Sequence, residues 1–230
     1  MTRRFKILGV LVALIGLAFL AAGGYSVMRA QQGDAALKAY SAEQNVKLSY
    51  NDAGQLTSAG ETAEAEAIMS LLTDDWGYSV ADSDFDPNDP IVNTSSEYMF
   101  QMATINYHIL HSTVTVTLAE PAEYNGETFA AGSYDFDVDG RYYADFDRAH
   151  PIEGPARGLA WSPTALGLIG ELGVGTVTAS ALQMGLGLAA AFGAVGATLL
   201  FIGLGLVWAT RATEPETAPV LKPVVAATPA

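Results

Sequence analysis

The chain has 230 residues, no cysteine, and a net charge of −14 from 25 acidic and 11 basic side chains. The lack of cysteine excludes disulfide bonds, thiol catalysis and Cys-based zinc sites. A strongly negative chain repels the phosphate backbone of nucleic acid, so nucleic-acid binding is also excluded as a function.

The first predicted element is transmembrane helix 1, over residues 7–28. This run has 22 uncharged residues, which at about 1.5 Å per residue reach roughly 33 Å, enough for a bilayer core of about 30 Å. A cleaved signal peptide is the alternative, because basic residues, an apolar run and small residues at 21–24 follow one another in that order. The length of the run and the interfacial Tyr25 favour a helix that stays in the bilayer.

The following segment, 29–161, is predicted to be one acidic domain of α+β class. A helix is expected over 61–72, where Ala, Glu and Met dominate. A second helix begins after Thr94, because Glu97 stands three residues later and completes a capping box. The Asp- and Pro-rich residues 82–90 between them indicate an exposed loop.

A small antiparallel sheet is predicted after the second helix. From Thr113 apolar residues alternate with polar ones, which is the period of a half-buried strand. Asn125-Gly126 is typical of a hairpin turn, and the alternation resumes at Tyr134.

The second apolar stretch, Leu172 to Thr210, is too long for a single crossing. Its 39 residues would extend about 58 Å as one helix. We therefore expect 162–181 to be an interfacial amphipathic segment and 182–208 to be transmembrane helix 2.

Small residues recur at four-residue spacing in the predicted second span, along a face that would let another helix approach closely. They are Gly185, Ala189, Gly193 and Ala197. The first span of the same chain is one possible partner, and a second copy or another membrane protein is the alternative.

Basic residues at both ends predict the orientation of the chain in a plasma membrane. Three precede the first span and two follow the second, so both termini should be cytoplasmic. Between Arg29 and Glu171 lie 23 of the 25 acidic residues but only 6 of the 11 basic ones. The predicted multi-pass organisation is a cytoplasmic N-terminus (1–6), transmembrane helix 1 (7–28), an acidic extracytoplasmic domain (29–161), an interfacial segment (162–181), transmembrane helix 2 (182–208) and a disordered cytoplasmic tail (209–230).

Three stretches resemble an uncharacterised family of two-span actinobacterial membrane proteins. They are DGRYYADFDRAHP from Asp139, GLAW from Gly158 and TASAL from Thr178. The resemblance covers the two-span layout and roughly Val114 to Trp208, and it implies membrane localisation without an established activity. Some members are labelled aromatic ring-opening dioxygenases, but such an iron site needs His and carboxylate ligands around open positions, and this sequence has no clear set.

One acidic pattern is a candidate metal site. Asp135, Asp137, Asp139 and Gly140 match the opening of a calcium-binding loop, in which alternate carboxylates face one hard cation. The twelfth position of that loop is Phe146 instead of the bidentate Glu. We therefore interpret the three aspartates mainly as the solvated face of a strand, and Ca²⁺ binding is the alternative.

The chain has no catalytic motif that favours an enzyme. His108 and His111 are three residues apart at the end of the second predicted helix, where the helix dipole favours histidine without any ligand. The pattern of a nucleophile elbow, a phosphate-binding loop or a dinucleotide fingerprint does not occur. We expect a non-enzymatic scaffold that binds other membrane or envelope proteins through its many aromatic residues. The alternative is an extracytoplasmic module that binds a cation or a small ligand.

Overall fold

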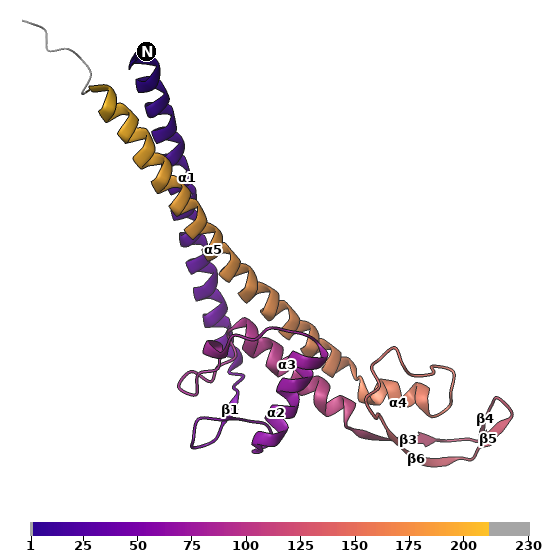
Figure 1. Ribbon diagram of the computed structural model, residues 1–230. Helices are drawn as coiled ribbons and strands as arrows, with labels where there is room; N and C mark the ends of the chain where they lie inside the picture. The colour runs from indigo at the N-terminus through magenta and orange to yellow at the C-terminus, as the bar shows by residue number, and fades with distance from the viewer. Residues whose placement is uncertain (1, 212–230) are drawn as a thin grey trace, which may run out of the picture. The chain divides into compact units, whose positions relative to one another are not determined.

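The computed structural model describes residues 2–211 and contains two long helices (Figure 1). Helix α1 is Thr2–Gln44 and helix α5 is Pro163–Arg211. Each holds a window long and apolar enough to cross a membrane, with mean hydropathy of 2.5 in α1 and 2.1 in α5. Few residues of these windows are buried, which fits side chains that face lipid better than the core helix of a soluble protein. The predicted tail from residue 212 onward lies outside the described residues.

The chain divides into two compact units, which we describe separately. The paired-helix unit contains Met1–Arg29 and Gly185–Ala230, and the α+β unit contains Ala30–Met184.

Helix α1 continues well beyond the predicted end of the first span at residue 28. Residues 29–44 contain five alanines and three glutamines, which have high helix propensity. Lys38 and Asp34 form an ion pair of 3.2 Å one turn apart. The helix ends at Gln44, after which Asn45 takes a left-handed conformation with φ of 52°.

The segment 162–181 is not a separate piece, because all but its first residue belongs to α5. Pro163 is tolerated at the first helical position, where its missing N–H would have no helical partner. Ser162 caps this end, since its Oγ accepts a hydrogen bond of 3.2 Å from the Ala165 N–H. Leu172 is then buried in the core of the α+β unit, so tertiary packing maintains the helix through its several glycines.

The α+β unit contains three more α-helices. They are α2 (Thr62–Ser70), α3 (Ser95–Leu110) and α4 (Glu153–Ala160), with a π-helical turn η1 (Leu71–Asp75) after α2 and a 3₁₀ turn η2 (Asp82–Asp84) in the predicted loop. The predicted capping box of α3 is confirmed. Thr94 Oγ1 accepts from the Glu97 N–H, and Glu97 Oε2 accepts from the N–H groups of Asn93 and Thr94 at 2.9 Å each.

The strands form three antiparallel two-stranded sheets instead of the one small sheet that was predicted. The pairs are β1 (Ser49–Tyr50) with β2 (Leu56–Thr57), β3 (Thr113–Leu118) with β6 (Gly132–Asp137), and β4 (Ala122–Tyr124) with β5 (Glu127–Phe129). The turn at Asn125-Gly126 is confirmed: both residues have positive φ, 50° and 84°, as a type I′ hairpin requires. The mixed class of helices with small antiparallel sheets is confirmed.

The α+β unit has two clusters of buried side chains. One is formed by α4 with the β3–β6 pair and the end of α3, and includes Val116, Val138 and Trp161. The other is formed by α2, α3 and the first part of α5, and includes Ile68 and Leu72, both with no exposed surface. Partly buried Trp76, Ile105 and Tyr107 pack against both clusters.

Candidate functional site

A large cavity of about 790 Å³ lies in the α+β unit. It is lined by the C-terminal part of α1, by α3 and by the N-terminal part of α5, together with the residues that follow α1 and precede α3. Most lining side chains are aliphatic; they include Leu37, Val46, Val92, Ile105, Leu168 and Leu172. Ligand pockets in proteins usually have volumes of about 300–1,000 Å³ and mainly apolar walls, and this cavity agrees with both.

Two glycines allow the helices around the cavity to pack closely. A Cβ on Gly175 of α5 would lie 2.6 Å from the Tyr98 ring of α3. A Cβ on Gly33 of α1 would lie 2.5 Å from a methyl carbon of Leu182. A side chain at Gly175 would press on the Tyr98 ring of the cavity wall. The flexible end of Leu182 has more freedom to move away from a side chain at Gly33.

Two hydrogen-bonded pairs place polar atoms on the apolar wall. The Tyr40 hydroxyl donates to Glu171 Oε1 at 2.7 Å, which joins α1 to α5. Ser41 Oγ and the Tyr98 hydroxyl lie 2.8 Å apart, which joins α1 to α3. The lining has further polar groups, from Gln44, Gln101 and Thr178. Polar groups on an otherwise apolar wall typically orient a ligand.

A smaller and more polar cavity of about 350 Å³ is lined by α3 and by the β1–β2 pair with its flanking residues. Lys47 and His108 line it together with several hydroxyl-bearing side chains. His108 Nδ1 is 3.7 Å from Glu64 Oε1.

The other two histidines have different partners. His111 Nδ1 lies 2.8 Å from the Tyr107 carbonyl oxygen. His150 accepts backbone hydrogen bonds at the start of α4. Within residues 2–211 no group of three or more His, Asp or Glu side chains is arranged to hold a metal ion.

The candidate calcium residues are engaged in the β3–β6 pair and its following turn. Asp135 Oδ1 accepts from Thr115 Oγ1 at 2.7 Å, and Asp137 Oδ1 accepts from Thr113 Oγ1 at 2.6 Å. Asp139 has a left-handed backbone with φ of 48° in the turn after β6. These cross-strand pairs are the arrangement expected of a solvated strand face, and Ca²⁺ binding stays a prediction.

In the paired-helix unit, the closest approach of α1 and α5 follows a seven-residue spacing. A Cβ on Gly9, Gly16 or Gly23 of α1 would lie 2.6–3.0 Å from backbone atoms of α5. A Cβ on Gly196 or Gly203 of α5 would lie 2.4–2.8 Å from backbone atoms of α1.

Only part of the predicted face of small residues at four-residue spacing lies at this contact between α1 and α5. Ala189 is buried and its carbonyl oxygen faces Gly23. Gly193 contributes its backbone nitrogen near Gly23, but a Cβ on Gly193 would meet no atom within 4 Å. Gly185 and Ala197 are only half-buried. A repeat of seven keeps one face toward the partner in a left-handed helix pair, and this signal was present in the sequence.

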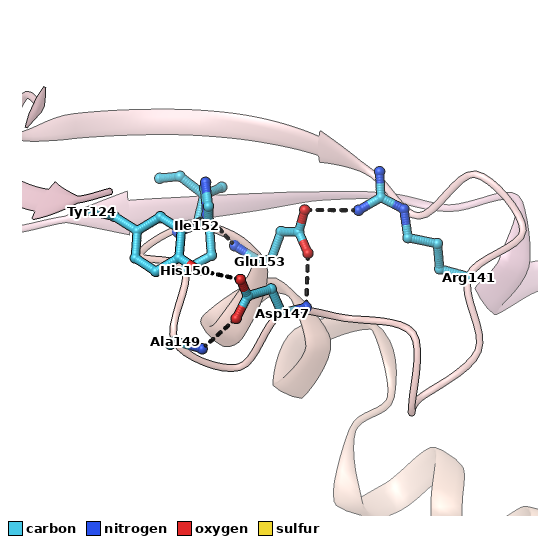
Figure 2. A network of polar contacts seen from close by, with 7 residues as sticks. All are labelled: Tyr124, Arg141, Asp147, Ala149, His150, Ile152 and Glu153. Carbon is cyan, nitrogen blue, oxygen red and sulfur yellow. Dashed lines mark hydrogen bonds and ion pairs between the residues drawn. The ribbon is translucent and has the colours of Figure 1, made fainter. Parts of the chain in front are cut away.

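A polar network fixes the loop between β6 and α4 (Figure 2). Glu153 Oε1 accepts from Arg141 at 3.1 Å, and its Oε2 accepts from the Asp147 N–H at 2.8 Å. His150 Nδ1 accepts from the N–H groups of Ile152 and Glu153 at 3.1 and 3.2 Å. Asp147 accepts from the Tyr124 hydroxyl and from the Ala149 N–H. Because each group is engaged in holding the loop, we interpret the network as structural.

The network predicts a pH dependence. The hydrogen bond from Tyr124 holds the pKa of Asp147 below its usual range and raises the pKa of Tyr124. A depressed pKa in the folded state means that the stabilisation is complete above the ordinary Asp pKa of about 3.9 and is lost as the pH falls through the folded-state value. Asp147→Asn should therefore lower the melting temperature of the full chain in detergent at pH 7, and the difference should shrink below about pH 4.

The matched control for this pH series is Glu127→Gln, an exposed position on β5. It should leave the melting temperature almost unchanged across the same range. Equal effects of the two variants would contradict the role of the Tyr124–Asp147 hydrogen bond.

Comparison with protein families, with curated proteins and with solved structures found no match to this chain.

Proposed function

We propose that this protein is a membrane-anchored binding module whose large cavity takes an apolar or amphiphilic small molecule. The observation that carries the proposal is the cavity of about 790 Å³ with its mainly aliphatic wall. An apolar pocket with a few convergent polar groups is the usual form of a small-molecule site.

The continuity of the helices supports an amphiphilic ligand. Gly33, the first lining residue on α1, follows the predicted span by five positions in the same unbroken helix. Apolar molecules concentrate in the bilayer because transfer of apolar surface out of water is favourable. A pocket built on helices that also carry membrane spans suits ligands of this kind.

The proposed topology places both termini in the cytoplasm and the α+β unit outside the plasma membrane. Its support is the distribution of basic residues, with Arg3, Arg4 and Lys6 before the first span and Arg211 after the second.

A second candidate function is the scaffold that binds membrane or envelope proteins without catalysing a reaction. Most aromatic side chains of the α+β unit are buried or half-buried, but neighbouring Tyr142 and Tyr143 are 39% and 40% exposed. Exposed tyrosines contribute large contact area to protein interfaces. Stoichiometric co-purification of a membrane protein in mild detergent, lost in the double variant Tyr142→Ala, Tyr143→Ala, would favour this function over ligand binding.

The binding function is tested by photo-crosslinking in phosphatidylcholine nanodiscs. The probe is a dodecyl alcohol that carries a diazirine on its chain, and labelled peptides are mapped by mass spectrometry. We expect labels on residues 33–46, 92–105 and 168–178, in addition to labels on the apolar spans.

Ala36→Trp fills the cavity from an exposed position on its rim. It should remove most labels from the three cavity segments while labels on the spans stay unchanged. Ala35→Trp is the matched control, because Ala35 is the preceding residue on α1 and does not line the cavity. Absence of cavity labels in the original chain, or equal labels in both variants, would contradict the proposed function.

A further inference from the structure

The lining of the large cavity contains a single charged side chain, and it is negative. Glu171 is its only charged lining residue, and none of the described residues that line it is Lys, Arg or His. Glu171 and the terminal Arg211 are also the only charged residues in the 49 residues of α5. Apart from the terminal Arg211, Glu171 is therefore the one charge of this helix, and it gives the cavity wall a negative group.

The geometry leaves this carboxylate able to bind a ligand. The Tyr40 hydroxyl donates a hydrogen bond of 2.7 Å to Glu171 Oε1, which holds the Glu171 side chain against α1. This hydrogen bond engages Oε1, and Glu171 is exposed, so its second oxygen, Oε2, is accessible to a ligand. Tyr40 is 51% exposed, so its aromatic ring is also accessible to a cation.

The two lysines of the α+β unit are placed elsewhere. Lys38 of α1 pairs with Asp34 at 3.2 Å. Lys47 lines the smaller cavity instead. The α+β unit as a whole is strongly acidic, and a negative field raises the local concentration of cations.

We propose that the cavity selects an amphiphile with a cationic polar end, whose alkyl chain occupies the aliphatic wall and whose ammonium group binds Glu171 and the Tyr40 ring. This selection rests on the proposed binding function. A carboxylate or phosphate head group would meet the negative charge of Glu171 without a compensating cation, and a neutral head group would gain no ion pair.

The test uses the full chain in phosphatidylcholine nanodiscs and three diazirine probes with the same dodecyl chain. Their polar ends are ammonium, hydroxyl and carboxylate. Concentration series give the half-saturation of labels on the three cavity segments, and labels on the spans correct for different partition into the bilayer. We expect the ammonium probe to half-saturate at a concentration about threefold lower than the hydroxyl probe, as for an ion pair with an exposed carboxylate, and the carboxylate probe to be the weakest.

Glu171→Gln should abolish the preference for the ammonium probe and keep the binding of the hydroxyl probe. Glu43→Gln is the matched control, since Glu43 is an exposed acid on α1 that does not line the cavity; it should leave the preference unchanged.

Each alternative result has a separate meaning. Equal half-saturation for all three probes would overturn the charge selection and leave the binding function intact. If the preference for the ammonium probe persists in Glu171→Gln, it arises from the electrostatic field of the whole acidic unit, and the role of Glu171 is overturned. If none of the probes gives cavity labels sensitive to Ala36→Trp, the proposed function itself fails.

Discussion

Replacement of Gly203 by leucine is expected to separate α1 from α5 in the paired-helix unit. A Cβ at this position would lie 2.4 Å from the Ala13 nitrogen and 2.6 Å from the Gly9 carbonyl oxygen, and backbone atoms have no rotamer into which they can retreat. Overpacking typically costs about 1–3 kcal/mol. We place this variant at the upper end, because the helices must move apart along their contact to accept the side chain.

Gly205→Leu is the matched control for Gly203→Leu. It introduces the same side chain two residues later, where a Cβ would meet no atom within 4 Å. The measurement is the mole fraction of SDS that half-unfolds the full chain in mixed micelles. Since the chain has no cysteine, labels on Leu14→Cys and Phe201→Cys can report the distance between the helices. Similar behaviour of the two leucine variants would contradict the close approach described here.

The second large effect is expected at Glu97, a carboxylate that is only 1% exposed. Its Oε2 accepts the N–H groups of Asn93 and Thr94, which have no helical partner at the start of α3. Glu97→Ala leaves both donors without this acceptor, and an unpaired buried group costs about 1–3 kcal/mol. Because Asn93 and Thr94 are half-buried, we expect the lower part of that range for each. The free energy of unfolding should therefore fall by about 2–4 kcal/mol in a urea titration of the full chain.

Glu97→Gln separates the hydrogen bonds from the charge. Burial raises the pKa of Glu97, although the hydrogen bonds from Asn93 and Thr94 oppose this shift. A raised pKa in the folded state means that stability declines as the pH rises from the unfolded-state value toward the folded-state value. The glutamine variant keeps an acceptor oxygen and should lose this decline while staying far more stable than Glu97→Ala. Glu66→Ala, an exposed acid on α2, should change stability by less than about 0.5 kcal/mol.

Local signals in the sequence were sufficient for several elements of the fold. The capping box at Thr94 and Glu97 and the turn at Asn125-Gly126 depend on residues within four positions of one another, so short-range chemistry decides them. The two apolar helices follow from length and composition alone.

The cavity could not be predicted from local signals. Its walls come from three segments that are distant in sequence, and the Tyr40–Glu171 hydrogen bond joins residues 131 positions apart. The number of sheets was also wrong, because alternation indicates that a segment is a strand but not which strand it pairs with. In the helix pair, the four-residue spacing of small residues includes Ala189, which lies at the contact, but not Gly196 and Gly203, which belong to a spacing of seven.

The glycine spacing in the paired-helix unit makes the number of residues between the contact glycines more critical than the identity of those residues. Adding or removing one residue between Gly9 and Gly16 would turn everything beyond it by about 100° and shift it by about 1.5 Å along the axis. Gly9 and Gly16 would then face different directions. A conservative substitution of a residue between them could not restore both contacts. Substitutions on the outward face therefore leave the contact intact, whereas an insertion or deletion between Gly9 and Gly16 breaks it.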